Sequence, residues 1–157
     1  MTSPTLLWLR QDLRLADQPA LAAAIHDGPV IPVYVLDDET PKHRQMGPAS
    51  RWWLHHSLEA LDRSLREKGS RLILRRGKCD EELAKVAKEV GAGTVHAIRH
   101  YEPWWRNAER AVAKRLDLVC HDGNYLAPPG SITSGSGAPY KIYTPFWRAL
   151  RDVMPPP

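Results

Sequence analysis

Side chains suited to ligand binding follow several apolar segments of this chain. Arg10, Asp37 and Glu102 each come shortly after a run of apolar residues. If these runs are parallel strands, their carboxyl ends meet at one edge of a sheet, where such folds bind ligands. Trp104 and Trp105 follow Glu102 closely, and indole rings stack on flat aromatic molecules. These residues indicate a cleft for a flat, polar aromatic ligand; the alternative is that they only form the polar rim of the sheet.

Several common catalytic and ligand-binding motifs are absent from the sequence. The turn at 10–14 contains no glycine, so it is not a dinucleotide-binding fingerprint. No P-loop and no GxSxG nucleophile motif occurs. His55 and His56 are adjacent on an expected helix and point about 100° apart. Cys79 and Cys120 stand outside any metal-binding spacing. We therefore expect neither a catalytic residue nor a metal site.

Short apolar runs alternate with helical patterns over most of the chain. The clearest helix spans 50–68, where leucines at four-three-four spacing form one stripe, and we expect Trp52 or Trp53 to join the core. Asp17 is placed to cap an earlier helix, and Pro103 to begin a later one. This alternation predicts a Rossmann-like, doubly wound α/β fold, with a five-stranded parallel sheet and helices on both faces. The expected strands are 5–9, 30–36, 71–75, 94–98 and 118–120.

The pattern changes near the end of the sequence. Residues 128–137 begin with two prolines and are rich in Gly and Ser, which is typical of a loop or linker. A new helical pattern begins at 144–150. We therefore expect an α/β domain over 1–127, followed in 128–157 by a linker and the first residues toward another domain.

The composition is that of a globular protein with a small positive charge. Of the 157 residues, 43% are hydrophobic and 25% are charged, and the net charge is +4. No apolar run is long enough to cross a membrane, and no signal peptide opens the chain, so we expect a cytoplasmic protein without membrane contact. The charge favours only weak, salt-sensitive binding to nucleic acid.

Six short segments spread along the chain resemble sequences of one protein family. Together they are similar to the N-terminal α/β domain of DNA photolyases and cryptochromes, and they extend over nearly the whole sequence. The segments are WLRQDLRLAD at 8–17, PAL at 19–21, PVYVLD at 32–37, RWWLHHSL at 51–58, YEPW at 101–104 and YTPFW at 143–147.

The resemblance implies a division of labour between two domains. In this family the N-terminal domain holds an antenna chromophore, which is methenyltetrahydrofolate in many members and a deazaflavin or flavin in others. The chromophore passes excitation to FAD in a following helical domain. Reduced FAD then donates an electron to a cyclobutane pyrimidine dimer flipped out of damaged DNA, and the dimer splits. We expect that helical FAD domain to be missing from this chain, which alone would be inactive.

The resemblance also implies particular site residues. In deazaflavin-binding members five cleft positions match this chain in residue type, at Arg10, Tyr34, Asp37, Arg51 and Glu102. The chain departs from that pattern at Gln11 and His100. Some folate-binding members have an Asn-Glu pair where Trp104 and Trp105 stand here, and either indole is placed to stack on a folate or flavin instead. The resemblance therefore does not decide whether the chromophore is methenyltetrahydrofolate, a deazaflavin or a flavin.

Two other functions compete with a light-driven repair enzyme, a carbon–carbon lyase. A cryptochrome is a blue-light photoreceptor without repair activity, and its N-terminal domain carries the same segments. A stand-alone nucleotide- or chromophore-binding module would need no second domain. The residues that would contact the DNA lesion lie outside the segments found here, so the sequence does not separate these alternatives.

Overall fold

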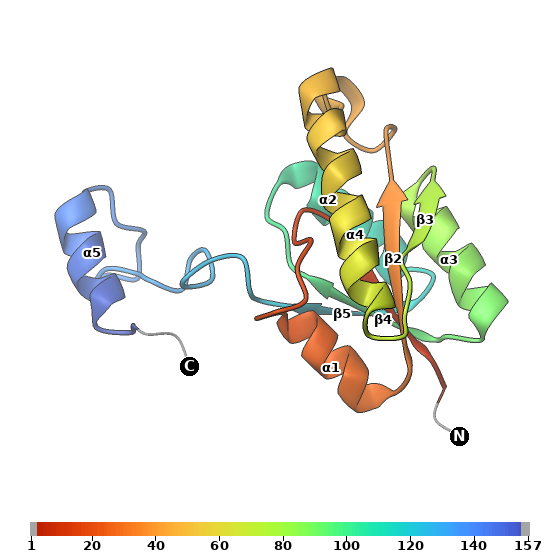
Figure 1. Ribbon diagram of the computed structural model, residues 1–157. Coiled ribbons are helices and arrows are strands. Elements are labelled where there is room, and N and C mark those ends of the chain that lie inside the picture. The colour runs from red at the N-terminus through yellow and green to blue at the C-terminus, as the bar shows by residue number, and fades with distance from the viewer. Residues whose placement is uncertain (1–2, 155–157) are drawn as a thin grey trace. The chain divides into compact units, whose positions relative to one another are not determined.

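The computed structural model of the chain describes residues 3–154 and contains two compact units, Met1–His121 and Asp122–Pro157. The first unit holds the five-stranded sheet of the described residues (Figure 1). All strand pairs are parallel, and the strand order is β3-β2-β1-β4-β5. This confirms the predicted fold class. The strands are β1 (Thr5–Leu9), β2 (Val30–Leu36), β3 (Ile73–Arg76), β4 (Thr94–Ile98) and β5 (Asp117–His121).

The strand boundaries match the predicted ones at β1, β2 and β4. β5 extends one residue further at each end than the predicted 118–120, and β3 is shifted. The sequence predicted a strand from residue 71, but β3 begins at Ile73. The backbone N–H of Leu72 donates to the Asp62 carboxylate at 2.8 Å, so a side chain rather than a neighbouring strand holds this residue.

Proline begins three of the helices that flank the sheet, where its missing N–H costs no hydrogen bond. The cap predicted at Asp17 is wrong, because the residue before α1 is Gln18 and no side chain caps this helix. The Gln18 amide instead donates to the Asp12 carboxylate at 2.8 Å. The helices are α1 (Pro19–Asp27), the short η1 (Lys42–Arg44), α2 (Pro48–Arg66), α3 (Cys79–Val90), α4 (Pro103–Ala113) and α5 (Tyr143–Arg151).

Helices α1 to α4 cover the two faces of the sheet, and β1 is buried along its whole length (Figure 1). Alternate residues of a strand point to opposite faces. Leu6 and Trp8 pack in one apolar core with α3 and α4, while Leu7 and Leu9 pack in another with α1 and α2. Fully burying side chains of this size contributes roughly 1.5–3 kcal/mol each. The central strand thus fixes the position of its own carboxyl end, where Arg10 follows.

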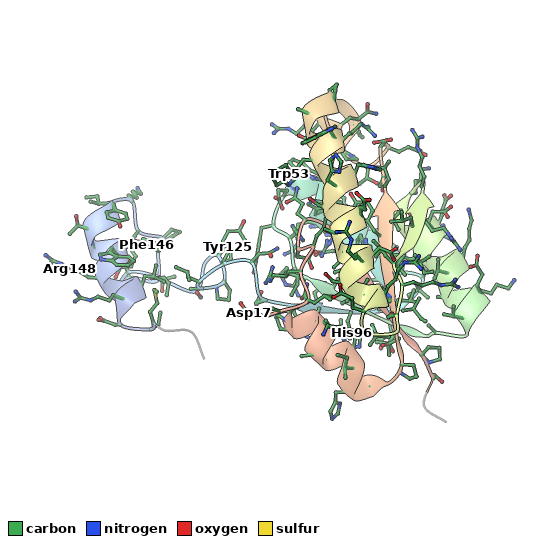
Figure 2. The ribbon with its side chains drawn as sticks, in the orientation of Figure 1. Asp17, Trp53, His96, Tyr125, Phe146 and Arg148 are labelled. Carbon is green, nitrogen blue, oxygen red and sulfur yellow. The ribbon has the colours of Figure 1, made fainter. Side chains whose placement is uncertain are left out.

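At least one of two adjacent tryptophans on α2 was expected to join the core, and that prediction is wrong. Trp52 is 64% exposed and Trp53 is 69% exposed. The leucine stripe already occupies the side of α2 that faces the sheet, with Leu61 and Leu65 buried. Trp53 projects from the flank of α2 (Figure 2), which leaves its indole free for another contact.

The second unit contains little regular structure in its described part. Thr133 and Pro139 form an isolated antiparallel bridge, and α5 follows with Leu150 buried. Among residues 3–154, no helix has both the length and the apolar character needed to cross a membrane.

Candidate functional site

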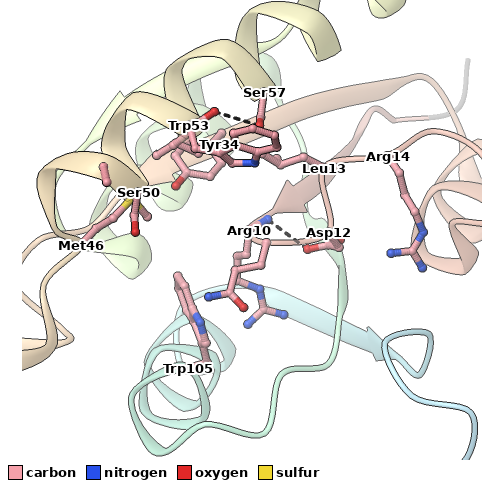
Figure 3. A pocket seen from close by; sticks show the side chains of 13 residues that line it. Arg10, Asp12, Leu13, Arg14, Tyr34, Met46, Ser50, Trp53, Ser57 and Trp105 are labelled. Carbon is pink, nitrogen blue, oxygen red and sulfur yellow. Dashed lines mark hydrogen bonds between the residues drawn. The ribbon is translucent and has the colours of Figure 1, made fainter.

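The chain reverses its winding between β1 and β4, since β1 leads to α1 on one face and β4 leads to α4 on the other. In doubly wound sheets this switch point is where ligands bind. A cleft of about 740 Å³ lies there (Figure 3), a volume that suits a small-molecule ligand. It is lined by Arg10, Gln11, Asp12, Leu13, Arg14, Tyr34, Met46, Ala49, Ser50, Trp53, Leu54, Ser57 and Trp105.

Arg10 lines the cleft, but most of its hydrogen-bonding groups already bond other parts of the chain. Its residue is only 2% exposed, and its Nη1 donates to Glu109 Oε1 at 2.9 Å. Its Nη2 donates to the carbonyl of Ile98. The guanidinium lies 4.3 Å from the ring centroid of Trp8 and 5.4 Å from that of Trp105. Arg10 therefore fixes the Trp105 side of the cleft. Of its three guanidinium nitrogens, Nε is the one without a hydrogen-bond partner among the described residues.

Asp12 holds the turn after β1 in one conformation. Its carboxylate accepts from the Arg10 backbone N–H at 3.1 Å and from Gln18 Nε2 at 2.8 Å, and it lies 3.4 Å from His100 Nε2. Burial raises the pKa of Asp12, but the hydrogen bonds from His100, Gln18 and backbone amides outweigh it and leave the pKa below 3.8. Asp12 is thus ionised at neutral pH, and its hydrogen bonds hold the turn that borders the cleft.

Aromatic side chains approach the cleft from two sides (Figure 3). Tyr34 and Trp53 lie on the α2 side, and Trp105 lies on the α4 side. Trp105 packs edge-to-face on Trp8, with ring centroids 6.3 Å apart, and its Nε1 is buried without a hydrogen-bond partner among the described residues. Burial, then Cys79 and Asp38, raises the pKa of Tyr34 to about 12, so its phenol keeps its proton. The arrangement combines stacking surfaces with neutral donors.

Arg10, Tyr34 and Trp105 are the predicted site residues that the structure brings together in this cleft, and Asp37 is not among its lining residues. The Asp37 carboxylate accepts from the backbone N–H groups of Glu39, Thr40 and Cys79 at 2.9, 2.8 and 3.1 Å, and from the Thr40 hydroxyl. Burial raises the pKa of Asp37, but these bonds outweigh it and lower the pKa below 3.8. Asp37 joins the ends of β2 and α3.

Arg51 also lies outside the cleft lining and forms an ion pair with Asp38, the residue after Asp37. Its Nη2 is 2.6 Å from Asp38 Oδ1, and its Nε donates to the carbonyl of Met46 at 3.0 Å. Asp38 also pairs with Arg76 at 3.3 Å. We call Asp37, Asp38, Arg51 and Arg76 the Asp37 cluster.

Glu102 and Trp104 have contacts outside the cleft lining as well. Glu102 precedes the first turn of α4, and its Oε2 lies 3.7 Å from His100 Nδ1. The Trp104 ring centroid lies 5.5 Å from the Arg44 guanidinium, a cation–π contact that links α4 to η1.

Comparison with known proteins assigns the chain to a family. The sequence pattern described as DNA photolyase matches residues 5–157. The chain belongs to the DNA photolyase family. Deoxyribodipyrimidine photo-lyase of Agrobacterium fabrum is 42% identical over 161 residues, covering 99% of this chain and 33% of that protein. Cryptochrome-1 of Arabidopsis thaliana is 35% identical over 149 residues, covering 91% of this chain and 22% of that protein.

A solved structure supports the same assignment. The crystal structure of a bacterial class III photolyase from Agrobacterium tumefaciens superposes with a TM-score of 0.86 at 41% identity, covering 96% of this chain and 32% of that one. The chain thus spans about a third of the length of these photolyases. The family predicted from the sequence is confirmed.

Helix α2 contributes cleft residues of this photolyase-family chain that the sequence reasoning missed. Ser50, Trp53, Leu54 and Ser57 line the cleft at spacing i, i+3, i+4 and i+7. That spacing places residues on one side of a helix. A second stripe beside the leucines was therefore visible in the sequence, but it mixes serine with an indole and does not stand out by hydropathy.

The two thiols of the photolyase-family chain are poorly suited to chemistry. Burial, together with Asp37, raises the pKa of the Cys79 thiol. Burial and Glu109 likewise raise the pKa of Cys120. Because the thiolate is the nucleophilic form, both groups are unreactive at neutral pH. The cleft has the character of a binding site, with aromatic surfaces and paired charges.

Proposed function

We propose that the cleft binds a flat antenna chromophore and that the complete protein is a deoxyribodipyrimidine photolyase. In that protein the chromophore absorbs light and passes excitation to reduced FAD in a helical domain, and FAD drives the splitting of cyclobutane pyrimidine dimers in DNA. The observation that carries the proposal is the 740 Å³ cleft at the switch point, with indoles on two sides. Damaged DNA and the FAD domain are the partners of the complete protein.

The residues of the chain supply three kinds of contact to such a ligand. Trp53 and Trp105 offer ring faces or edges for stacking, and Leu13, Met46 and Leu54 exclude water. The buried Nε1 of Trp105 has its donor available for a ring carbonyl or nitrogen. Arg10, paired with Glu109, supports Trp105 from behind through a cation–π contact with its ring.

The three candidate chromophore classes share a flat, polar, fused ring. Methenyltetrahydrofolate, a deazaflavin and a flavin therefore compete for the same stacking surfaces. The three compounds can be distinguished by experiment, because each has its own absorption band.

A photolyase is favoured over a cryptochrome by the comparisons. The Agrobacterium photo-lyase is 42% identical to this chain, whereas Cryptochrome-1 of Arabidopsis is 35% identical. A cryptochrome without repair activity is the second candidate, and the same antenna cleft would serve it.

Chromophore binding is tested by titrating each of the three compounds into the chain and recording absorbance and Trp fluorescence. Trp105→Ala should weaken binding by roughly 5- to 150-fold, since stacking on an aromatic side chain is worth about 1–3 kcal/mol. Trp52→Ala is the control for removing an indole, because Trp52 does not line the cleft. Failure of all three compounds to bind would refute the antenna proposal.

Repair is tested separately on the complete protein, with a dimer-containing oligonucleotide, blue light and a dark control. Loss of the dimers in light alone supports the photolyase. Tight flavin binding and antenna transfer without repair would identify a cryptochrome instead.

A further inference from the structure

We propose that the exposed side of α2 carries a binding site for a late first-row divalent metal ion such as Zn²⁺, formed by His55, His56 and Glu59. One ligand atom from each residue lies within 4.8 Å of the other two. The site is separate from the cleft, whose lining contains none of these residues. Nothing in the proposed antenna function requires it.

The geometry revises the expectation that adjacent histidines diverge too far to share a ligand. The rings of His55 and His56 lie with centroids only 5.1 Å apart, at 74°. Each imidazole is long enough to turn toward its neighbour. Glu59 stands one turn further along, four residues after His55 and three after His56, so it lies on the same side of the helix as both. His56 Nδ1 is already 3.6 Å from Glu59 Oε2.

A bound ion would draw these atoms slightly closer. Zn–N and Zn–O bonds of about 2.0–2.1 Å place tetrahedral ligands roughly 3.3 Å apart. The side chains of His56 and Glu59 are about half exposed, at 50% and 58%, so small rotamer changes can close the gap without disturbing the core. Two imidazole nitrogens and one carboxylate oxygen suit Zn²⁺, Ni²⁺ or Cu²⁺ better than Mg²⁺ or Ca²⁺. The remaining coordination positions would face water.

Trp52 gives the site a second feature. Its ring packs edge-to-face on His56 with centroids 4.6 Å apart, although the indole is 64% exposed. This contact limits the orientations of the His56 imidazole and so prepares it as a ligand. It also provides a reporter, because a Cu²⁺ ion held by His56 would quench Trp52 fluorescence.

The site would act on the helix that borders the cleft. His55, His56 and Glu59 interleave along α2 with Trp53, Leu54 and Ser57, which line the cleft from the other side of the helix. A metal bridging one turn stabilises the folded helix by mass action, since the unfolded chain lacks the preformed set of ligands. We therefore expect added Zn²⁺ to raise the thermal midpoint of the chain.

The experiment is Zn²⁺ titration of the metal-free chain by calorimetry near neutral pH. We expect one ion per chain, and His55→Ala or Glu59→Gln should each weaken binding by at least about tenfold, a loss of about 1.4 kcal/mol. His26→Ala is the matched control, because His26 is an exposed histidine paired with Asp27 outside α2. Cys120→Ser excludes a thiol as the ligand. Circular dichroism verifies that each variant folds.

The reporter provides an independent measurement. Cu²⁺ should quench the wild-type chain, and Trp52→Phe should remove most of that quenching while the heat of Zn²⁺ binding remains. Equal Zn²⁺ affinity in the wild type, His55→Ala and Glu59→Gln would overturn the site. So would an absence of uptake at about 1 mM Zn²⁺, a concentration that corresponds to only about 4 kcal/mol of binding energy.

Discussion

The cleft and the Asp37 cluster both lie where strands of the same sheet end, but they differ in how far their polar groups are already satisfied. In the Asp37 cluster, the Asp37 carboxylate accepts from three backbone N–H groups and one hydroxyl. Asp38 is shared between Arg51 and Arg76. In the cleft, Arg10 Nε and Trp105 Nε1 are buried without partners among the described residues, beside an open volume.

This difference separates a charge cluster with satisfied partners from a candidate binding site. A buried polar group without a partner costs about 1–3 kcal/mol, so an unsatisfied donor next to open space indicates a place where a ligand can bond. A carboxylate whose oxygens are all occupied contributes to stability instead. Mutations in the Asp37 cluster should therefore lower the free energy of unfolding, whereas mutations in the cleft should lower the affinity for the chromophore.

The largest effect is expected at Glu109, which joins the cleft to the core. Glu109→Ala leaves the buried Arg10 guanidinium without its carboxylate partner, and breaking such a pair typically costs about 3–5 kcal/mol. Urea unfolding measures this loss. Glu89→Ala is the control, because its pair with Arg75 is partly exposed and worth less than about 1 kcal/mol. Equal losses in the two variants would show that Arg10 is not held as the structure describes.

Asp37→Ala should give the next largest loss of stability. Removing an acceptor that satisfies several backbone N–H groups costs about 1–3 kcal/mol, measured by the same unfolding experiment. Chromophore affinity should stay within about twofold, since the side chain does not line the cleft. Trp53→Ala should show the reverse pattern, with affinity lost and the free energy of unfolding changed less, because Trp53 lines the cleft and is 69% exposed. A large affinity loss in Asp37→Ala would erase the distinction between the two regions.

The sequence alone predicted the sheet well and the site in part. The runs that became β1, β2 and β4 are short and mainly apolar, and such runs indicate buried parallel strands. Arg10 and Trp105 were placed at the correct edge because they follow two of those strands. The fold class depends on local patterns of this kind, which are visible in the residues themselves.

The role of Asp37 could not be predicted in the same way. Its carboxylate is bonded by the N–H of Cys79, which is 42 residues away in sequence. Whether that oxygen meets a ligand or an amide depends on how α3 packs beside β2. Trp53 was missed for a related reason, since its exposure follows from the leucines occupying the core side of α2. Which side chains of a helix face the core depends on tertiary packing, and the sequence pattern of that helix alone does not decide it.

Acid should weaken the Asp37 cluster gradually. The folded pKa of Asp37 lies below its ordinary value of 3.8, because the hydrogen bonds to its carboxylate outweigh burial. Its stabilising contribution is therefore complete above the unfolded pKa and is lost as the pH falls through the lower folded pKa. We expect the stability difference between the wild type and Asp37→Asn to be constant near neutral pH and to shrink below pH 3.8. Urea unfolding at a series of pH values measures it, and a difference that grew in acid would contradict the sign.

The smallest effect is expected at Arg51, where the sequence resemblance and the structure lead to different expectations. The resemblance places Arg51 against the chromophore, whereas the structure pairs it with Asp38 and the Met46 carbonyl. Met46 lines the cleft, so Arg51 can affect a ligand only through the loop that it holds. Arg51→Ala should therefore change chromophore affinity by less than about twofold, and raised salt should reduce even that effect because the pair is partly exposed.

Arg51→Lys makes the comparison sharper. Lysine keeps the positive charge but cannot repeat the guanidinium's contacts with Asp38 and Met46 together. If Arg51 acts only by holding the loop, Arg51→Lys and Arg51→Ala should have similarly small effects in the chromophore titration. If Arg51→Ala instead lost as much affinity as Trp105→Ala while Arg51→Lys retained it, a direct charge contact with the ligand would be shown. The cleft would then have to extend into the Asp37 cluster when the chromophore binds.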